Sequence, residues 1–299
     1  MSSQSPYHAW HNFRAYSFDS DEQWKLYLQN LTFPENLNDQ KKKEMILKYK
    51  KKYYSQHVEK LVEFQLPYTQ LEIAPMSPNH DSTIIFLHGL GDQGSGWLDV
   101  FQKLKKTVPE LASCKVLLPN ASAMSVTLNM GYVMPAWYDL MSLSLDGPED
   151  MTGMEKCFAN IDLLIEREMV EFGIDSSRII IGGFSQGGSV ALYHGLTNKK
   201  KLGGIIALST WMPMRKKIVT LVGTDFPNKS TPIFQAHGTA DNVVKYEWGA
   251  SSKKFVAESL LDGNESHYTF KTYQGMGHSS SLQEIRDLAE WLASVLKSK

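Results

Sequence analysis

Short apolar runs alternate along this chain with segments of helical periodicity, and this alternation restricts the fold more than any other feature. Residues 179–181 are three consecutive isoleucines, so the strand that contains them must be covered on both faces. Such strands are typical of parallel sheets in α/β proteins. We therefore predict an α/β fold with a mostly parallel, doubly wound sheet and helices on both faces. The predicted strands are 83–88, 115–118, 178–182, 204–208, 232–236 and 268–273, the predicted helices are 96–107, 153–172, 186–197, 247–261 and 281–297, and the proline-rich stretch 67–81 is predicted to form turns.

Residues 1–65 differ in character from residues 66–299, and we predict a domain boundary between them. The first segment lacks strand-like apolar runs, and its stretch from Lys41 to Lys52 holds seven lysines against one glutamate. We predict a basic extension that is mainly helical or irregular. Three interpretations of its role stay open: a solvated helix packed on its own domain, peripheral contact with anionic membrane through residues 41–60, and a nuclear-localisation or nucleic-acid patch.

Charge, cysteine content and hydropathy restrict the setting of the protein. The net charge of −1 argues against nucleic-acid binding by the larger domain, because such binding depends on clustered Lys and Arg. The chain has only two cysteines, Cys114 and Cys157, too few for a disulfide scaffold. Neither an apolar signal-peptide core nor a run of 18 apolar residues is present. We expect a cytoplasmic protein, with peripheral membrane contact and a nuclear pool left open.

Ligands of open parallel sheets bind outside the carboxyl ends of the strands, so the residues after each strand deserve inspection. The first predicted strand is followed by the motif G-x-G-x-x-G at 89–94. A dinucleotide site would also need an acid at the end of the second strand, where Pro119 and Asn120 stand instead. We therefore predict that this loop brings a backbone N–H close to a reacting oxyanion, and that His88 shapes the loop.

The third predicted strand leads into G-x-S-x-G at 183–187, with Ser185 at its centre. The string alone is weak evidence, but here it joins an apolar strand to a helix. Flanking glycines permit the tight turn that projects a nucleophile off the sheet. We predict that Ser185 is a nucleophile; the competing interpretation is a helix N-cap serine in a glycine-rich turn.

A serine nucleophile needs a histidine base and usually an acid that orients the histidine. Where the serine lies in a G-x-S-x-G turn, the acid and then the histidine follow it, each after a later strand. Asp241 follows the predicted strand 232–236 and His278 follows 268–273. We predict that His278 is the base and Asp241 its partner, against an ordinary surface histidine and a turn aspartate. His237 lies beside the acid, and His267 lies at the wrong end of its strand.

At this point the sequence resembles the acyl-protein thioesterase branch of the phospholipase/carboxylesterase family, which are serine hydrolases of the α/β-hydrolase fold. The resemblance covers about residues 67–299, and residues 1–65 are an addition to the family pattern. It implies Ser185, Asp241 and His278 as the catalytic residues and the backbone N–H groups of Leu90 and Gln186 as the oxyanion hole. The matching stretches are FLHGLGDQGSGW (86–97), VTLNMGYVMPAWYD (126–139), GGFSQGG (182–188), HGTAD (237–241) and TYQGMGHSS (272–280).

Six of the 13 methionines lie between Met124 and Met154. Flexible thioethers suit an adaptable apolar groove, although ordinary packing would explain them equally well. The resemblance places acyl-binding loops in this region and implies Trp137, Gly89 and Met134 as substrate-binding residues.

We therefore predict a serine hydrolase that removes fatty acyl groups from protein cysteines through an acyl-enzyme, without a metal or an organic cofactor. The implied substrates are S-acylated proteins, with lysophospholipids and small esters as further substrates of the family. Two alternatives stay open. One is a carboxylesterase or lysophospholipase of the same fold; the other is a catalytically silent module that only binds acyl groups.

Overall fold

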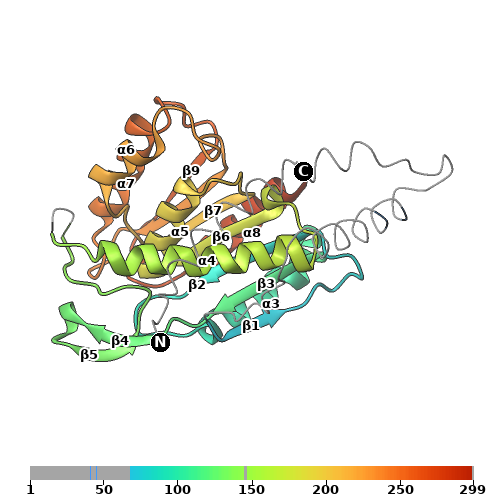
Figure 1. Cartoon of the computed structure of the whole chain (residues 1–299), viewed down its shortest axis with the longest axis horizontal. Helices are drawn as coiled ribbons and strands as arrows, with labels where there is room; N and C mark the ends of the chain where they lie inside the picture. Colours follow the sequence, from blue (N-terminus) through green and yellow to red (C-terminus); the bar gives the residue numbers. More distant parts are fainter. Residues whose placement is uncertain (1–40, 42–44, 46–67, 145–146, 298–299) are drawn as a thin grey trace, which may run out of the picture. The chain divides into compact units, whose positions relative to one another are not determined.

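The computed structural model describes residues 41, 45, 68–144 and 147–297 and contains a seven-stranded sheet (Figure 1). The strand order is β1-β3-β2-β6-β7-β8-β9. β1 runs antiparallel to β3, and all the other neighbours are parallel. The predicted mostly parallel sheet is therefore confirmed. The strands are β1 (Gln70–Ile73), β2 (Ser82–Leu87), β3 (Cys114–Pro119), β6 (Ile179–Phe184), β7 (Gly204–Leu208), β8 (Ile233–Gly238) and β9 (Tyr268–Tyr273).

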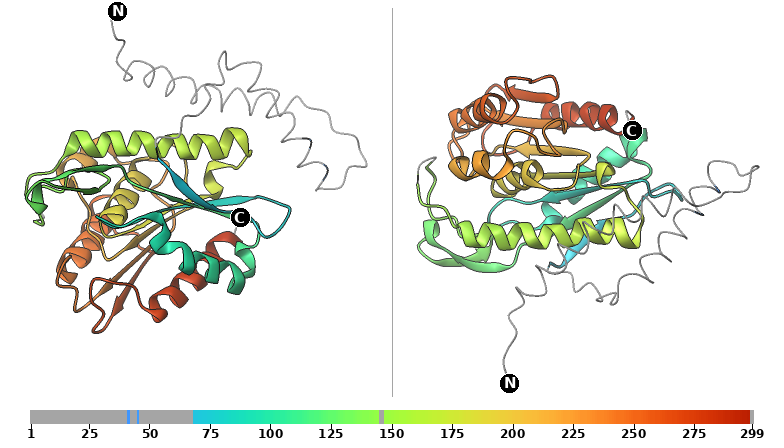
Figure 2. Two further views of the ribbon diagram at one scale, coloured as in Figure 1. Left: turned by 90° about the horizontal axis from the view of Figure 1, so that it is seen from below. Right: turned by 45° about the horizontal axis from the view of Figure 1, so that its top comes forward.

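Helices cover both faces of the sheet, as predicted (Figure 2, left). α3 and α8 pack on one face, where Phe101 and Leu288 join Phe86 of β2 in one apolar cluster. α4 lies on the opposite face together with α5. None of the helices in the described part of the chain is long and apolar enough to cross a membrane. The helices are α3 (Leu98–Thr107), α4 (Met151–Glu171), α5 (Gln186–Thr197), α6 (Arg215–Val222), α7 (Tyr246–Ser259) and α8 (Leu282–Lys297).

Four elements, three strands and one helix, were not predicted, and each lacks a strong apolar pattern. β1 lies within 67–81, where the prediction of turns alone was wrong; as an edge strand it has no fully buried residue and therefore carries no continuous apolar signal. Helix α6 buries only Ile218. The strands β4 (Ala123–Val126) and β5 (Tyr132–Pro135) form a separate two-stranded hairpin, and both are too short for periodicity to reveal them.

The predictions for residues 1–65 concern residues that lie almost entirely outside the described part of the chain. The boundary near residue 65 and the basic helix therefore stay predictions. In the rest of the chain, β2, β6, β8 and β9 run parallel, so the loops after these four strands leave the sheet at the same edge. The candidate catalytic and oxyanion residues follow these strands, whereas Met134 and Trp137 lie in and just after β5.

Candidate active site

Ser185 occupies a strained turn between β6 and α5. Its backbone angles are φ 53° and ψ −119°, a combination that residues with a side chain rarely adopt. The Ser185 N–H donates to the Leu208 carbonyl at 2.9 Å, and the Thr210 hydroxyl donates to the Ser185 carbonyl at 2.7 Å. These bonds tie the turn to residues at and beyond the end of β7 and hold it in an unfavourable conformation.

Gly183 and Gly187 allow this turn to lie against neighbouring backbone. A Cβ placed at Gly187 would lie 2.4 Å from the carbonyl oxygen of Leu87 and 2.5 Å from that of His88. A Cβ at Gly183 would lie 2.3 Å from the backbone of Gly187 itself. Gly187 is therefore required by the close approach of the turn to the end of β2, and Gly183 by the close approach of the end of β6 to the start of α5.

The structure brings Ser185, His278 and Asp241 together from three separate loops. The His278 Nε2 lies 2.9 Å from the Ser185 Oγ, and the His278 Nδ1 lies 2.8 Å from the Asp241 Oδ2. The Phe184 ring packs beside the His278 ring, with the centroids 4.8 Å apart. With the proton on Nδ1, the imidazole donates to Asp241 and accepts from the Ser185 hydroxyl, which is the orientation that a general base requires.

The Asp241 carboxylate is buried and surrounded by donors. Its Oδ1 accepts the backbone N–H groups of Val243 and Val244, both at 2.9 Å. Burial alone would raise the pKa of this carboxyl, but hydrogen bonds from His237, His278 and the Val243 amide bring it well below its ordinary value. Asp241 is therefore an anion throughout the neutral range, suited to stabilising a protonated His278.

The loop after β2 lies directly beside Ser185. A Cβ placed at Gly89 would lie 3.5 Å from the Ser185 Cβ, so the next amide in the chain, that of Leu90, belongs to the same corner. The Gln186 amide is the first of α5, and amides in a first helical turn have no intrahelical acceptor. The segments that carry the two predicted oxyanion donors thus both adjoin Ser185, and the role of the two amides stays a prediction.

His88 shapes this loop by hydrogen bonds at both ring nitrogens. The Ala121 N–H donates to its Nε2 at 3.0 Å, which leaves the proton on Nδ1 to donate to the Gly89 carbonyl at 2.7 Å. The ring is fully buried. It therefore fixes the backbone on which the Leu90 amide depends, rather than facing a substrate.

Trp137 lies behind the same loop and is only 4% exposed. Its Nε1–H donates to the His88 carbonyl at 2.7 Å, and its backbone N–H donates to the Gln186 Oε1 at 3.1 Å. The Gln186 Nε2 in turn donates to the Tyr138 carbonyl at 2.8 Å. Sequence reasoning considered only the amide of Gln186 and missed this side-chain connection, for which no sequence motif gives a signal.

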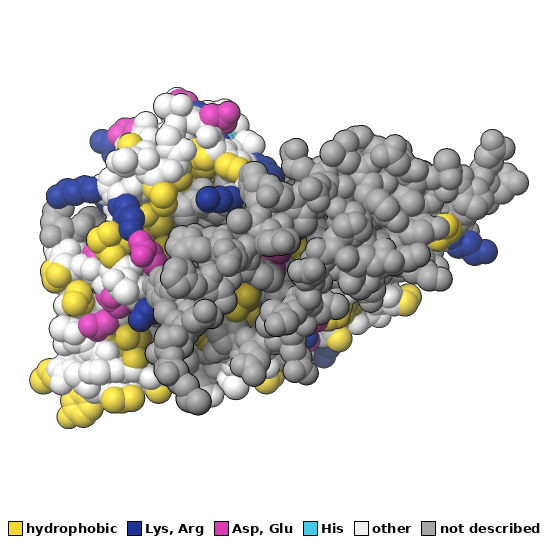
Figure 3. Space-filling model, in the orientation of Figure 1, with side chains coloured by type: hydrophobic (Ala, Val, Ile, Leu, Met, Phe, Trp, Pro, Cys, Tyr) yellow, Lys and Arg dark blue, Asp and Glu magenta, His cyan; other side chains and the backbone are white. Residues whose placement is uncertain are grey.

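Apolar side chains gather over the β4–β5 hairpin, at the lower left of the space-filling view (Figure 3). Met130 is 91% exposed, and Tyr132 and Val133 are each 70% exposed. Met134, on the same hairpin, is half-buried, and its Sδ lies 3.8 Å from where a Cβ of Gly91 would be. The hairpin therefore reaches from exposed apolar residues to the loop beside Ser185.

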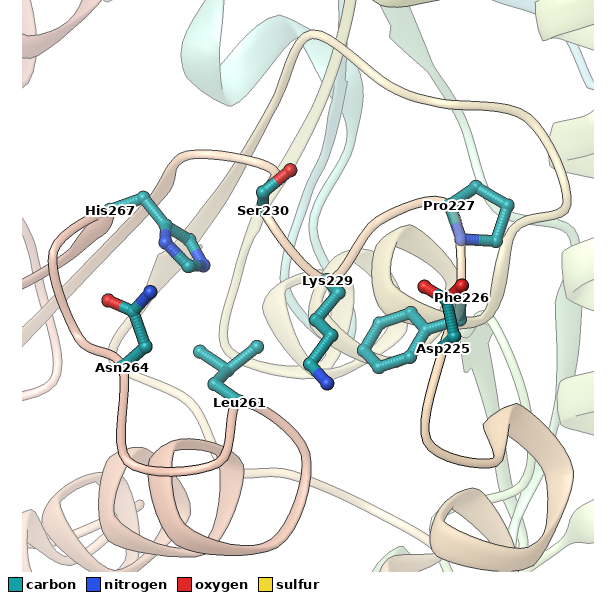
Figure 4. Close-up of a pocket in the computed structure, with 8 residues that line it drawn as sticks. All are labelled: Asp225, Phe226, Pro227, Lys229, Ser230, Leu261, Asn264 and His267. Atoms are coloured by element: carbon teal, nitrogen blue, oxygen red, sulfur yellow. The ribbon is translucent and has the colours of Figure 1, made fainter.

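A cavity of about 610 Å³ lies at the opposite end of the sheet (Figure 4). It is formed by the segments that precede β8 and β9, and includes His267, which the sequence analysis set aside as a base. Its Lys229 ammonium is already bound by the Thr224 carbonyl and Asp262. Because it lies where β8 and β9 begin, the cavity is not part of the Ser185 corner, which lies where the parallel strands end. Among the described residues, no group of three or more His, Cys, Asp or Glu side chains is placed to hold a metal ion.

Comparison with known proteins gives the same family along the whole described domain. The family model for Phospholipase/Carboxylesterase matches residues 68–296. An acyl-protein thioesterase 1 from Mycosarcoma maydis is 44% identical over 226 residues, covering 73% of this chain and 92% of that protein. Another, from Cryptococcus neoformans var. neoformans serotype D, is 42% identical over 242 residues, covering 77% and 99%.

Solved structures agree with the sequence matches. The crystal structure of Arabidopsis thaliana SOBER1 has a TM-score of 0.65 at 33% identity and covers 72% of this chain and 99% of that chain. The crystal structure of Zea mays acyl-protein thioesterase 2 has a TM-score of 0.66 at 30% identity and covers 77% and 99%. The α/β-hydrolase fold implied by the sequence motifs is confirmed, and the chain belongs to the phospholipase/carboxylesterase family of hydrolases.

Proposed function

We propose that this protein is a serine hydrolase that releases fatty acyl groups from protein cysteines through an acyl-enzyme. The observation that carries the proposal is the continuous chain of hydrogen bonds from Asp241 through His278 to Ser185. Several relatives bear the name acyl-protein thioesterase 1, which favours a thioester on protein as the substrate. The reaction itself needs only the side chains and amides at this corner.

In the first half-reaction the His278 Nε2 takes the Ser185 proton while the Ser185 Oγ attacks the acyl carbonyl carbon. The carbonyl oxygen becomes an oxyanion, which the Leu90 and Gln186 amides stabilise by hydrogen bonds. Collapse of the intermediate breaks the bond between the acyl carbon and the cysteine sulfur, and His278 protonates the departing thiolate. The products are the free cysteine and an acylated Ser185.

In the second half-reaction water replaces the thiol. His278 removes a proton from water, and the hydroxide adds to the acyl carbonyl of the acyl-enzyme. Collapse then breaks the ester bond, and the proton returns from His278 to the Ser185 oxygen. The buried, ionised Asp241 stabilises the imidazolium in both halves and holds its Nδ1 proton away from Ser185.

We further propose that the acyl chain lies along the β4–β5 hairpin. The supporting observations are the contact between this hairpin and the loop beside Ser185, and the exposed apolar side chains of Met130, Tyr132 and Val133. In this proposal Met134 contacts the acyl chain. Trp137 is buried and supports the loop from behind through its hydrogen bond to the His88 carbonyl.

The test is hydrolysis of an S-palmitoylated cysteine peptide by the wild type and by Ser185→Ala, with a short-chain aryl ester and a lysophospholipid run in parallel. Loss of a triad nucleophile costs on the order of 10⁶ in kcat, so peptide cleavage should disappear in the variant. Ester or lysophospholipid cleavage without peptide cleavage would support the carboxylesterase or lysophospholipase alternative. No turnover of any substrate, with retained binding of the peptide, would support a binding module.

The basic segment carries a separate proposal. We propose a cytoplasmic protein whose residues 41–60 contact anionic membrane, because the seven lysines between 41 and 52 would be attracted to acidic lipids. Binding to phosphatidylserine vesicles should weaken with added salt and fall strongly when these lysines are replaced by glutamine. Binding that neither salt nor the substitutions alter would contradict this role.

A further inference from the structure

A second histidine lies against the carboxylate of Asp241. His237, the residue before the last one of β8, is fully buried. Its Nε2 lies 2.8 Å from the Val244 carbonyl oxygen and 3.4 Å from the Asp241 Oδ2. The same Oδ2 accepts the Nδ1–H of His278. Asp241 is therefore shared by two imidazoles, one of which reaches Ser185 and one of which does not.

The surroundings of His237 determine where its proton resides. The Nδ1 has no hydrogen-bond partner among the described residues, and it faces the backbone of α7. A Cβ placed at Gly249 would lie only 2.3 Å from this Nδ1. A proton on Nδ1 would be a buried donor without an acceptor, which is costly. A proton on Nε2 therefore fits the site: it is donated to the Val244 carbonyl, and the Asp241 Oδ2 lies 3.4 Å from the same nitrogen.

Two hydrogen bonds and one close contact of 3.4 Å link His237, Val244 and Asp241 in a ring. The Val244 N–H donates to the Asp241 Oδ1, the Val244 carbonyl accepts from His237, and His237 lies beside the Asp241 Oδ2. The carboxylate thus cannot rotate without breaking contacts on both of its oxygens. Tyr246 closes the outer side of the His237 ring in an edge-on contact, with the centroids 6.0 Å apart.

We propose that His237 is a positioning residue, which acts through Asp241 to hold the carboxylate in the plane that His278 needs. The inference rests on the proposed function, because it assumes that Asp241 orients the base. His237 itself touches neither the substrate nor Ser185. Its contribution is realised when His278 becomes an imidazolium, since a displaced Asp241 would stabilise that charge less well.

Substitution of His237 by glutamine or by asparagine distinguishes the effect of the Nε2 donor from the effect of the volume of the ring. In His237→Gln the side-chain amide nitrogen reaches the position of Nε2, so the donor is retained; in His237→Asn it reaches only the position of Nδ1. Without the Nε2 contacts to the Val244 carbonyl and the Asp241 carboxylate, His237→Asn should lower kcat by about 10- to 100-fold, with KM changed by less than about twofold. His237→Gln should stay within about fivefold of the wild type, on the same principle.

The decisive measurement is a double-mutant cycle with Asp241→Asn, which alone should lower kcat by about 10⁴. Activities are normalised to folded enzyme by circular dichroism and thermal unfolding. If His237 acts through the carboxylate, adding His237→Asn to Asp241→Asn should cost less than about twofold. An equal cost in both backgrounds, or equal losses for Asn and Gln, would overturn the proposal and leave His237 as a packing residue.

The same variants also show what it means if a His237 variant does not fold or if Asp241→Asn stays active. If His237→Asn does not fold, His237→Leu fills a similar volume without a donor and takes its place; if neither folds while His237→Gln does, the role is structural and the proposal fails. If Asp241→Asn retains full activity, the proposed catalytic role of Asp241 fails instead. The failure of this inference and that of the proposed function are therefore distinguishable.

Discussion

Glu284 should make the stability of the folded protein fall as the pH rises. This residue lies in the first turn of α8, a few residues after His278, and is fully buried. Neither of its carboxylate oxygens has a hydrogen-bond partner among the described residues. Burial raises the pKa of Glu284 from 4.5 to about 8, and the nearby Asp287 acts in the same direction. The folded state therefore holds a proton on Glu284 over a range in which the unfolded chain has lost it.

The sign and the size of the change in unfolding free energy follow from this difference in bound protons. Stability falls with pH wherever the folded state binds more protons, which here means from about pH 4.5 to about pH 8. The interval corresponds to about 5 kcal/mol of unfolding free energy, of which about 3 kcal/mol develops between about pH 5.5 and pH 9. Glu284→Gln removes the ionisation while keeping the shape. Relative to the wild type, the variant should therefore gain about 3 kcal/mol in stability over the same interval.

Urea unfolding of both proteins at the two pH values measures this gain, because other titrating groups cancel in the difference. The matched control is Glu290→Gln, which neutralises an exposed carboxylate on the same helix and should leave the pH dependence as in the wild type. A stability difference between Glu284→Gln and the wild type that is equal at both pH values would refute the reasoning.

Three further substitutions test the packing of the Ser185 corner. Ser185→Gly should be more stable than Ser185→Ala by about 1 kcal/mol in urea unfolding, because glycine relieves the positive φ; equal stabilities would contradict the assigned strain. Gly187→Ala should lose at least about 3 kcal/mol or fail to fold, since its Cβ would meet two carbonyl oxygens, and wild-type thermal stability would contradict that contact. Trp137→Phe should cost about 1–3 kcal/mol by leaving the His88 carbonyl without its donor; an unchanged unfolding midpoint would mean that another donor replaces the indole.

The strands of the parallel sheet could be predicted wherever burial on both faces produced continuous apolar runs. The strand that begins Ile179-Ile180-Ile181 buries its first five residues, and the sequence revealed it for that reason. The edge strand β1 and the β4–β5 hairpin could not be found in the same way, because half-exposed four-residue strands carry almost no periodic signal. Their positions depend on tertiary pairing with β3 and with each other, which a local pattern does not contain.

The candidate site shows the same division between local and tertiary information. Ser185, Asp241 and His278 could be nominated because each directly follows a strand, and parallel strands deliver their carboxyl ends to one edge. His237 belongs to a strand and was set aside for lying beside the acid, yet that position is what places its Nε2 near the Asp241 Oδ2. Strand-end reasoning identifies groups that face the substrate, and it overlooks groups that hold them from within the sheet.

The strain at Ser185 and the burial of Asp241 both oppose folding. Hydrogen bonds from the sheet and its adjoining turns offset each of them. The Ser185 backbone is tied to Leu208 and Thr210, and the Asp241 carboxylate receives two amides and two imidazoles. Because these partners come from the sheet and its adjoining turns, the geometry of the site is set before any substrate arrives, as preorganised catalysis requires. Substitutions that relax the site should therefore raise stability while lowering activity, and Ser185→Gly is the sharpest case, because it removes the strain and the nucleophile in one step.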